Sequence, residues 1–446
     1  MQGILKKMVI NIMENLEGDM KKSILMITPE NKEINRFRKR QINNFIQITM
    51  PYLAAFIDES KYEITLIDEY NQKIPFEKDF DLVVITVNTA NAPHCYNISK
   101  KFRNKGSKVA FGGPHATLLP YEAQEHCDVL IIGEAEENWP VFLEEFYDGN
   151  YKREYKCLNT PSLEGIPIPR RDLIKRRRFT KGAVFATRGC PYSCSYCNLK
   201  QIYKDSFRKR PVNEVIDDIK NIKSRFFVFW DDNFFGDIEY AKELLKELSK
   251  LNKKWAAQVT LERCNNEELL KLAKRAGCIY FFVGLESFSK ETLNSVNKGL
   301  NNVDKYKDLI DSVHKYGICI QAGIIFGFDT DTTEVFKTTL DMCNFLGIDG
   351  VTVSILTPLP KTPLYYQLKE EDRLLTEDWS YYNGKTKVAF KPKNMSKDEL
   401  FEGYMWFRRN FYSLKSIAIR LRKSKANILY NLIVNLGYKI SIRKTS

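Results

Sequence analysis

Arg188-Gly189-Cys190-Pro191-Tyr192-Ser193-Cys194-Ser195-Tyr196-Cys197 is the stretch that decides how this chain is interpreted, because it places three cysteines in a CxxxCxxC spacing. Three closely spaced thiolates can hold three irons of a [4Fe–4S] cluster and leave the fourth iron open to another ligand. A zinc knuckle is normally closed by four ligands, usually as two pairs. No second pair occurs here, and the four histidines lie far from the triplet in the sequence: His94, His115, His126 and His314. We therefore expect Cys190, Cys194 and Cys197 to bind a cluster, with zinc or unliganded thiols as the alternative.

The triplet resembles the motif of the radical S-adenosylmethionine (SAM) superfamily, CxxxCxΦC with an aromatic residue at Φ, here Tyr196. The resemblance implies that the amino and carboxylate groups of SAM chelate the open iron, with Tyr196 among the residues of the SAM site. It also implies that an electron from the reduced cluster cleaves the SAM sulfonium to give a 5′-deoxyadenosyl radical. An external electron donor of the flavodoxin or ferredoxin type is implied as well.

The middle of the chain alternates β-branched or aromatic runs with amphipathic helical stretches, which is typical of a parallel α/β fold. Six strands are expected, at Ala183–Thr187, Phe226–Trp230, Trp255–Val259, Ile279–Gly284, Ile318–Phe326 and Gly350–Leu356. Six such units predict a partial (β/α)6 barrel, as the family resemblance also implies. Ligands of parallel barrels bind at the loops that follow the strands, so these loops hold the candidate residues.

Three of these loops carry candidates for SAM binding. Glu286, in Gly284-Leu285-Glu286-Ser287, suits the ribose hydroxyls or the amino group of SAM, and resembles the family's G-x-E-S element. Its alternative role is helix capping. Asp232, in Trp230-Asp231-Asp232-Asn233, stands where many family members have Gly-Gly-Glu, and a turn without a ligand is the alternative. Gln258 ends the third expected strand.

The first 150 residues predict a second α/β unit. Strand-like runs at Ser23–Thr28, Glu63–Asp68, Asp81–Val87, Lys108–Phe111 and Val129–Ile132 indicate a doubly wound sheet of about five parallel strands, whose ligands bind beyond the strands' carboxyl ends. Glycines there allow close backbone approach, and small hydroxyl residues can hydrogen-bond a ligand. The candidates are Thr86, Thr89, Gly112, Gly113, His115, Gly133 and Glu134.

Upstream of CxxxCxxC, this unit resembles the cobalamin-binding domain of cobalamin-dependent radical SAM enzymes. The resemblance covers roughly residues 22–375 and implies cobalamin as a third cofactor. The common signature D-x-H-x-x-G is absent, so cobalamin is expected to bind without a protein imidazole below the cobalt. His115 is a less favoured cobalt ligand. A domain that has this fold but binds no corrin is the alternative.

Length and composition set the remaining expectations. The 446 residues leave room for several domains, and 43% hydrophobic residues is ordinary for a globular protein. The predicted division is 1–19 as an extension, 20–150 as the cobalamin-binding-like domain, 151–180 as a linker, 181–372 as the barrel and 373–446 as a C-terminal region with a basic helical tail. No run approaches the ~20 apolar residues that cross a bilayer. Scattered single cysteines indicate a reducing cytoplasm.

The tail carries much of the net charge of +13: residues 403–446 contain ten Lys or Arg and no Asp or Glu. Basic residues interleaved with aromatic and aliphatic ones are typical of helices on anionic membrane surfaces. The tail therefore predicts peripheral contact at the inner membrane face, or an anionic, lipid-like substrate. Nucleic acid is less favoured because no RNA-binding module is evident. A helix that packs on the barrel with a solvated basic face is the plain alternative.

Together these observations predict a cobalamin-dependent radical SAM enzyme that methylates an unactivated carbon of a lipid-like or anionic small molecule. Cyclisation or carbon–carbon coupling without cobalamin is the alternative within enzymes. A non-catalytic iron–sulfur sensor or scaffold is the alternative from another class.

Overall fold

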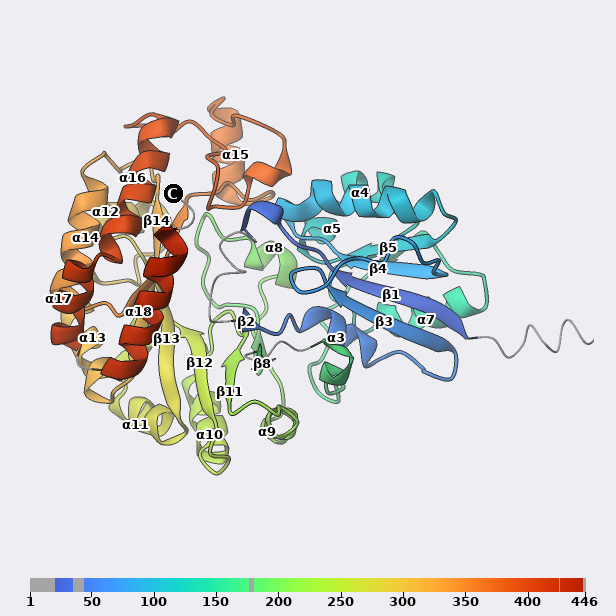
Figure 1. Cartoon of the computed structure of the whole chain (residues 1–446), viewed down its shortest axis with the longest axis horizontal. Coiled ribbons are helices and arrows are strands. Elements are labelled where there is room, and N and C mark those ends of the chain that lie inside the picture. The colour runs from blue at the N-terminus through green and yellow to red at the C-terminus, as the bar shows by residue number, and fades with distance from the viewer. Residues whose placement is uncertain (1–20, 35–43, 176–179, 425, 444–446) are drawn as a thin grey trace, which may run out of the picture.

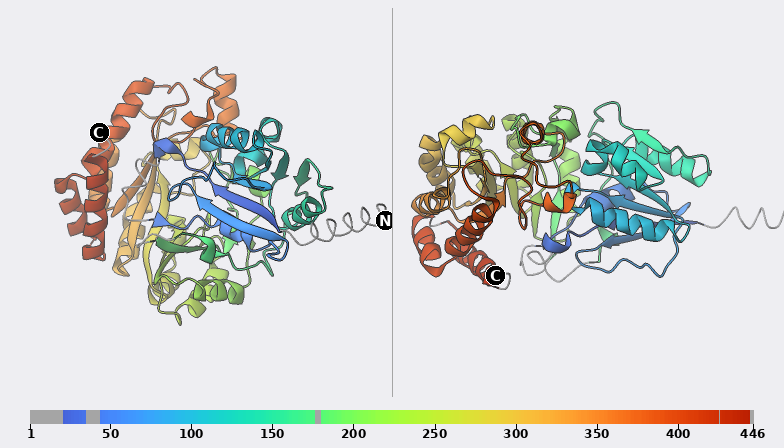
Figure 2. Two further views of the ribbon diagram at one scale, coloured as in Figure 1. Left: turned by 45° about the vertical axis from the view of Figure 1, so that its right-hand side comes forward. Right: turned by 90° about the horizontal axis from the view of Figure 1, so that it is seen from above.

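A computed structural model describes residues 21–34, 44–175, 180–424 and 426–443. Two parallel β-sheets stand side by side, each covered by helices (Figure 1). Helix α17 (Leu414–Ser424) lies at the end of the molecule that is remote from the first sheet, whereas α18 (Ile428–Arg443) lies across the second sheet (Figure 1 and Figure 2). Residues 1–19, predicted as an extension, lie outside the described residues.

The first sheet has the order β3-β1-β4-β5-β6-β7, and every neighbouring pair is parallel. Its strands are β1 (Lys22–Thr28), β3 (Tyr62–Asp68), β4 (Leu82–Thr86), β5 (Lys108–Gly112), β6 (Val129–Ile132) and β7 (Glu154–Lys156). The five expected strands are confirmed. The short β7 falls in the segment predicted as a linker, where only Tyr155 of three residues is buried, so its sequence gives little strand signal.

Alternating side chains of this sheet pack against helices on its two faces. Ile24 and Met26 of β1 join one core with α3 (Thr49–Ala54) and α7 (Asn138–Tyr147). Leu25 and Ile27 join the other core with α4 (Ala92–Arg103) and α6 (Pro120–Glu125). Two further short helices are η1 (Thr89–Asn91) and α5 (Pro114–Leu118). The direction of winding reverses between β1 and β4, and such a reversal is where doubly wound sheets bind ligands.

The second sheet has the order β15-β14-β13-β12-β11-β8-β2, again all parallel. Its strands are β8 (Thr180–Val184), β11 (Phe226–Phe229), β12 (Lys254–Val259), β13 (Cys278–Glu286), β14 (Cys319–Phe326), β15 (Gly350–Ile355) and β2 (Asn44–Phe45). The predicted partial barrel is confirmed. Its first strand lies earlier than expected, because Thr187 belongs to a separate pair of β9 (Thr187–Arg188) with β10 (Arg208–Lys209). The sequence did not predict β2, which comes from the first domain.

Helices cover the barrel sheet in the expected alternation. They are α8 (Leu199–Tyr203), α9 (Val212–Lys220), α10 (Ile238–Leu248), η3 (Leu261–Asn265), α11 (Glu267–Arg275), α12 (Lys290–Ser295), η4 (Val303–Lys305), α13 (Tyr306–Lys315), α14 (Val335–Leu346) and α15 (Pro363–Glu370). Two short segments connect the domains and the tail: η2 (Arg171–Leu173) and η5 (Trp379–Tyr381). The large core between helices and sheet centres on Phe227, Trp255 and Phe281.

The tail forms α16 (Lys397–Phe411), α17 (Leu414–Ser424) and α18 (Ile428–Arg443). Ser396 and Glu399 form a capping box that starts α16, whose Tyr404, Phe407 and Phe411 are buried against the barrel. The predicted helical tail is thus confirmed, and it packs on the barrel. Across the described residues, no helix combines the length and apolar character needed to cross a membrane.

Candidate functional site

The CxxxCxxC loop is held in place by its neighbours on several sides. Gly189 adopts a φ of +87°, and a Cβ there would lie 1.9 Å from the Ser206 carbonyl oxygen, so only glycine fits before Cys190. The Ser195 amide donates to the Val296 carbonyl at 3.1 Å, and the Ser195 carbonyl accepts from Leu364 N at 3.1 Å. The loop is therefore fixed at both of its ends before any metal binds.

The Cys197 thiol is hard to ionise before a metal binds. Burial, with smaller contributions from Cys194 and Cys190, raises the pKa of this thiol to about 11. Within the described ranges, no three His, Cys, Asp or Glu side chains lie close enough to share a single metal ion. A cluster makes a different demand, because each thiolate binds its own iron. Three thiols on one fixed loop fit that demand.

Asp231 and Asp232, which follow β11, have different tasks. Asp231 is buried and accepts hydrogen bonds from the backbone amides of Ala186 and Thr187 and from the Thr187 hydroxyl. It therefore supports the segment that leads into the cysteine loop. Asp232 accepts from Gly189 N at 3.2 Å, while its carbonyl accepts from Gln258 Nε2 at 3.0 Å. Burial raises the pKa of the Asp232 carboxyl to about 6.

Glu286 occupies a strained position at the end of β13. Its φ is +64°, where the pairing of β13 with β14 also shifts register. Non-glycine residues in this region cost of order 1–3 kcal/mol, and such strain gathers at functional sites. A Cβ on Gly284 would lie 2.4 Å from Glu286 Oε1, so this glycine lets the carboxyl group fold back over its own strand.

Beside Glu286 lies a lysine that the sequence analysis missed. Lys298 Nζ is 3.7 Å from Glu286 Oε1, and its side chain is almost fully buried. Burial disfavours the ammonium, but Glu286 together with Cys194, Cys190 and Glu262 outweighs this effect and raises the pKa of Lys298. Tyr196 also interacts with the Glu286 carboxyl, and its ring packs edge-on against Phe328. The predicted SAM residues Tyr196 and Glu286 are therefore neighbours.

A second missed residue is Glu262, three positions beyond the end of β12. Both of its carboxylate oxygens are buried and find no hydrogen-bond partner among the described residues. Burial raises the pKa of this carboxyl group, and Lys298 is close enough to oppose the shift. A buried carboxylate without partners is costly unless a ligand supplies them. Its place after a strand, in Thr260-Leu261-Glu262, was the signal available in the sequence.

A cavity of about 500 Å³ lies between the two sheets. Five predicted cobalamin residues line it from the first sheet: Thr86, Gly112, Gly113, Gly133 and Glu134. The barrel contributes Thr187, Arg188, Trp230 and Asp232. Loops that follow strands of both sheets thus face one space, which extends to the cysteine loop through Arg188 and Asp232.

Gly113 shows why the cavity needs glycine. Its φ is +97°, and a Cβ there would lie 2.8 Å from Thr86 Oγ1 and 3.1 Å from Val87 N. The backbone of Gly113 therefore forms part of the wall itself. This is the close-approach surface that a bulky ring ligand requires.

Two candidates lie away from the cavity. His115 is fully buried, and its Nε2 is 2.8 Å from the hydroxyl of Tyr96. It also packs against Trp379. Thr89 is buried in η1 and does not line the cavity either. The structure thus separates these two residues from the five that share the cavity.

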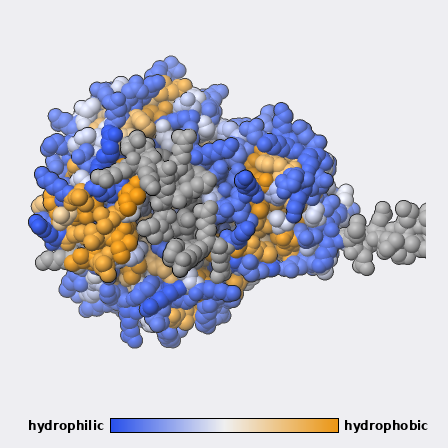
Figure 3. All heavy atoms as spheres, in the orientation of Figure 1, coloured by the Kyte–Doolittle hydropathy of each residue, from blue (hydrophilic) through white to orange (hydrophobic). Residues whose placement is uncertain are grey.

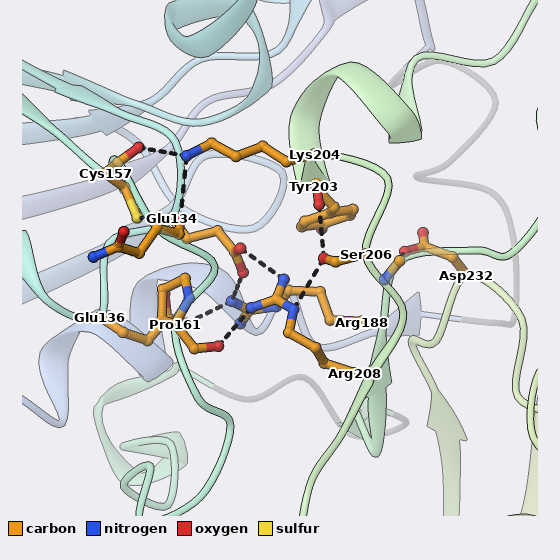
Figure 4. Close-up of polar contacts among 12 residues, drawn as sticks. Glu134, Glu136, Cys157, Pro161, Arg188, Tyr203, Lys204, Ser206, Arg208 and Asp232 are labelled. Carbon is orange, nitrogen blue, oxygen red and sulfur yellow. Dashed lines mark hydrogen bonds and ion pairs between the residues drawn. The ribbon is translucent and has the colours of Figure 1, made fainter.

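An ion-pair network ties the first sheet to the cysteine loop (Figure 4). Arg188 Nη1 pairs with Glu136 Oε1 at 2.7 Å and with Glu134, and Arg208 Nη2 pairs with Glu134 Oε1 at 2.6 Å. The Tyr52 hydroxyl donates to Glu136. Burial opposes ionisation of Glu136, but Arg188 outweighs it and the pKa of Glu136 is lowered.

Models of known families match three stretches of the chain. They are the radical SAM superfamily over residues 184–343, the B12-binding domain over 43–143, and a domain of unknown function over 362–434. The first two matches coincide with the second sheet and the first sheet.

Similar proteins extend over most of the chain. A bacteriochlorophyllide d C-12(1)-methyltransferase of Chlorobaculum tepidum is 31% identical over 87% of this chain and 88% of its own length. A hopanoid C-2 methylase of Rhodopseudomonas palustris is 26% identical over 88% of this chain and 79% of its own. The solved structure of the radical SAM methyltransferase TsrM of Kitasatospora setae, with cobalamin and a [4Fe–4S] cluster bound, matches with a TM-score of 0.66 at 16% identity. It covers 87% of this chain and 88% of that one.

Proposed function

Because this chain belongs to the radical SAM superfamily, in the branch that carries a B12-binding domain, we propose that it methylates an unactivated carbon of a lipid-like or anionic small molecule. Its cofactors are a [4Fe–4S] cluster, SAM and cobalamin. One observation carries the proposal: the glycine loops of the first sheet and the approach to the cysteine loop line the same cavity.

When bound, the cluster and SAM supply a carbon-centred radical, and the corrin supplies a methyl group. The chain's own residues hold these groups. Cys190, Cys194 and Cys197 would each bind one iron and leave one iron for SAM. Tyr196, Glu286, Asp232, Gln258 and the newly found Glu262 and Lys298 are the residues that would hold SAM. The two sheets that face each other would exclude water from the reaction.

The substrate class rests on two supports. The relatives named above act, by name, on a bacteriochlorophyllide and on hopanoids. The basic C-terminal region of this chain suits a substrate that is anionic or held at a lipid surface. We further propose that a flavodoxin or ferredoxin reduces the cluster and that the enzyme works in the cytoplasm.

Anaerobic reconstitution tests the proposal. The full chain is loaded with iron, sulfide and hydroxocobalamin, reduced with flavodoxin, and supplied with methyl-deuterated SAM and either a hopanoid or a bacteriochlorophyllide. We expect 5′-deoxyadenosine, S-adenosylhomocysteine and a product that carries the deuterated methyl group. If 5′-deoxyadenosine forms but neither S-adenosylhomocysteine nor a methylated product does, cyclisation or coupling replaces methylation. If the loaded protein cleaves no SAM at all, the non-catalytic alternative gains support.

A further inference from the structure

Helix α18 turns its polar side inward. Asn431 and Asn435 are each about 1% exposed. Asn435 Nδ2 donates to the Asp349 carbonyl at 2.8 Å, and Asn431 bonds the Asp349 carboxylate. Arg420 of α17 donates to Asn435 Oδ1 at 2.9 Å and to the Asp349 carbonyl at 3.0 Å. Hydrogen bonds to buried polar groups, together with packing of Tyr430 and Tyr438, therefore attach this helix to the barrel.

The opposite side of α18 is apolar and faces solvent. At 100° per residue, six aliphatic side chains share this side. We call them the apolar stripe: Ile428, Leu429, Leu432, Ile433, Leu436 and Ile440. Leu429 is 72% exposed, and Ile433 and Ile440 are at least half exposed. A surface helix normally buries such residues, so this arrangement is the reverse of the usual one.

The space-filling view shows a hydrophobic area over α18, with hydrophilic residues to its left and below it (Figure 3). Leu414 at the start of α17 and Phe345 at the end of α14 are also more than half exposed. Clusters of this kind on a protein surface mark places where a partner binds.

The basic residues of α17 and α18 indicate which class of partner the stripe binds. Lys415, Arg422 and Lys423 are exposed on α17, the helix that contacts α18, and Lys439 lies on the same side of α18 as the stripe. No Asp or Glu occurs between residues 403 and 446 to offset them. A second copy of this face would bring like charges together, which opposes association. An anionic lipid surface instead pairs its headgroups with the lysines and arginines and accepts the aliphatic side chains.

We propose that α17 and α18 dock the protein on the surface of an anionic lipid bilayer, with the apolar stripe inserted at the headgroup boundary. The stripe supplies the apolar contact and the basic residues of α17 supply the attraction. This docking does not depend on methyl transfer, since none of the stripe residues lines the cavity between the sheets.

Vesicle sedimentation of the reconstituted full chain tests this inference. The vesicles contain phosphatidylglycerol and phosphatidylcholine, or phosphatidylcholine alone. The double variant Leu429→Gln/Ile433→Gln should bind the anionic vesicles about tenfold or more weakly, since each buried aliphatic side chain contributes on the order of a tenfold factor. Leu158→Gln, at a leucine that is 75% exposed far from the stripe in the sequence, is the matched control and should bind like the wild type.

A charge variant tests the electrostatic attraction between the basic residues and the anionic lipid. Lys415→Gln/Arg422→Gln should bind anionic vesicles more weakly, and wild-type binding should fall as salt rises, because attraction between exposed charges is screened within about 10 Å at 0.1 M salt. Cluster absorption checks that each variant is folded. Equal binding of the stripe variant and Leu158→Gln would overturn the proposal. A second result would also overturn it. Light scattering without lipid would show that the wild type is a dimer and the stripe variant a monomer, and neither protein would bind vesicles.

Discussion

At the scale of single residues, the site is a set of buried groups that lack full partners until ligands arrive. Glu262 has two unpartnered oxygens, and Glu286 holds a strained backbone to reach Lys298 and Tyr196. Such costs of order 1–3 kcal/mol persist only where the surroundings enforce them. The strain therefore supports the proposal that these residues form the SAM site.

The cluster ligands give the first prediction. Since each thiolate binds one iron, Cys190→Ala, Cys194→Ala or Cys197→Ala should each abolish the [4Fe–4S] absorption and SAM cleavage. Cys278→Ala and Cys343→Ala, at buried cysteines of the barrel core, are the controls and should retain iron. Iron analysis and visible absorption after anaerobic reconstitution provide the measurement. Comparable iron loss in a control would show that the wrong ligands were chosen.

The two glutamates that we expect to bind SAM, Glu286 and Glu262, give the second prediction. Glu286→Gln should keep its iron but weaken SAM binding by roughly 1.5–3 kcal/mol, the range for a hydrogen bond to a charged group. Glu262→Gln should show a similar loss if its free oxygens bind SAM. Glu291→Gln, at an exposed residue of α12, is the control. Equilibrium binding of SAM to the oxidised protein measures the effect, and unchanged affinity in both variants would contradict the assignment.

At the scale of elements, loops after parallel strands do most of the positioning. Gly113 after β5 and Gly133 after β6 present bare backbone to the cavity, while Asp231 and Asp232 after β11 brace the cysteine loop. The strand ends of both sheets thus contribute to one region, although they are far apart in the sequence.

A pair of glycines tests this use of backbone. Gly113→Ala places a methyl group 2.8 Å from Thr86 Oγ1, whereas Gly106→Ala meets nothing within 4 Å. Both have a φ above +90°, so both pay a similar conformational cost of about 1–2 kcal/mol. We expect only Gly113→Ala to weaken corrin binding, by about tenfold or more, which corresponds to ~1.4 kcal/mol. Corrin retained after desalting is the measurement, and equal retention in the two variants would argue against a corrin beside Gly113.

A partly buried lysine, Lys385, predicts a pH dependence. Burial lowers the pKa of Lys385 from 10.5 to about 7, although its Nζ donates to Val353 O and Ser354 Oγ. A depressed folded-state pKa contributes stability that is present above pH 10.5 and lost as pH falls towards 7. The stability of the wild type relative to Lys385→Met should therefore rise between pH 7 and 10. Urea unfolding at several pH values measures this, with Lys305→Met as an exposed control. A flat difference would show that Lys385 stays charged.

The elements also show how far sequence reasoning reaches. Residue periodicity and turn residues predicted eleven strands that the structure confirms, because each is four or more residues long and contains several buried apolar residues. The short β2 and β7 were missed because two or three residues carry no periodic signal. Glu286 stood out through its glycine and serine neighbours, whereas Lys298 lies twelve positions later and reaches the site only through the turn of the chain after α12.

At the scale of the whole molecule, the two domains are joined by buried charge. Arg188 precedes the cluster cysteines and pairs with Glu134 and Glu136 of the first domain. This network links the first-domain side of the cavity to the segment that leads into the cysteine loop. The position of the segment before the cysteine loop therefore depends on contacts with the folded first domain.

Removal of Arg188 tests this link. Arg188→Met leaves Glu134 and Glu136 with fewer cations, and breaking one side of a buried ion pair typically costs about 3–5 kcal/mol. The thermal midpoint should fall accordingly. Arg188→Met/Glu136→Gln should recover part of the loss, because it removes a carboxylate that would otherwise be buried without its cation. Should Arg188→Met unfold like the wild type, the network would not be what holds the domains together.

Strand β2 has a consequence for how the protein folds during its synthesis. It leaves the first domain after β1 and pairs with β8, so β2 forms the edge of the barrel sheet and covers β8. A ribosome therefore delivers β2 long before β8 exists to receive it, and the first domain must wait for the barrel to complete the pairing. A barrel expressed without the first domain would expose the backbone edge of β8, and exposed edges invite aggregation. We therefore expect either half, when expressed alone or exchanged, to be insoluble, so that its activity could not be measured.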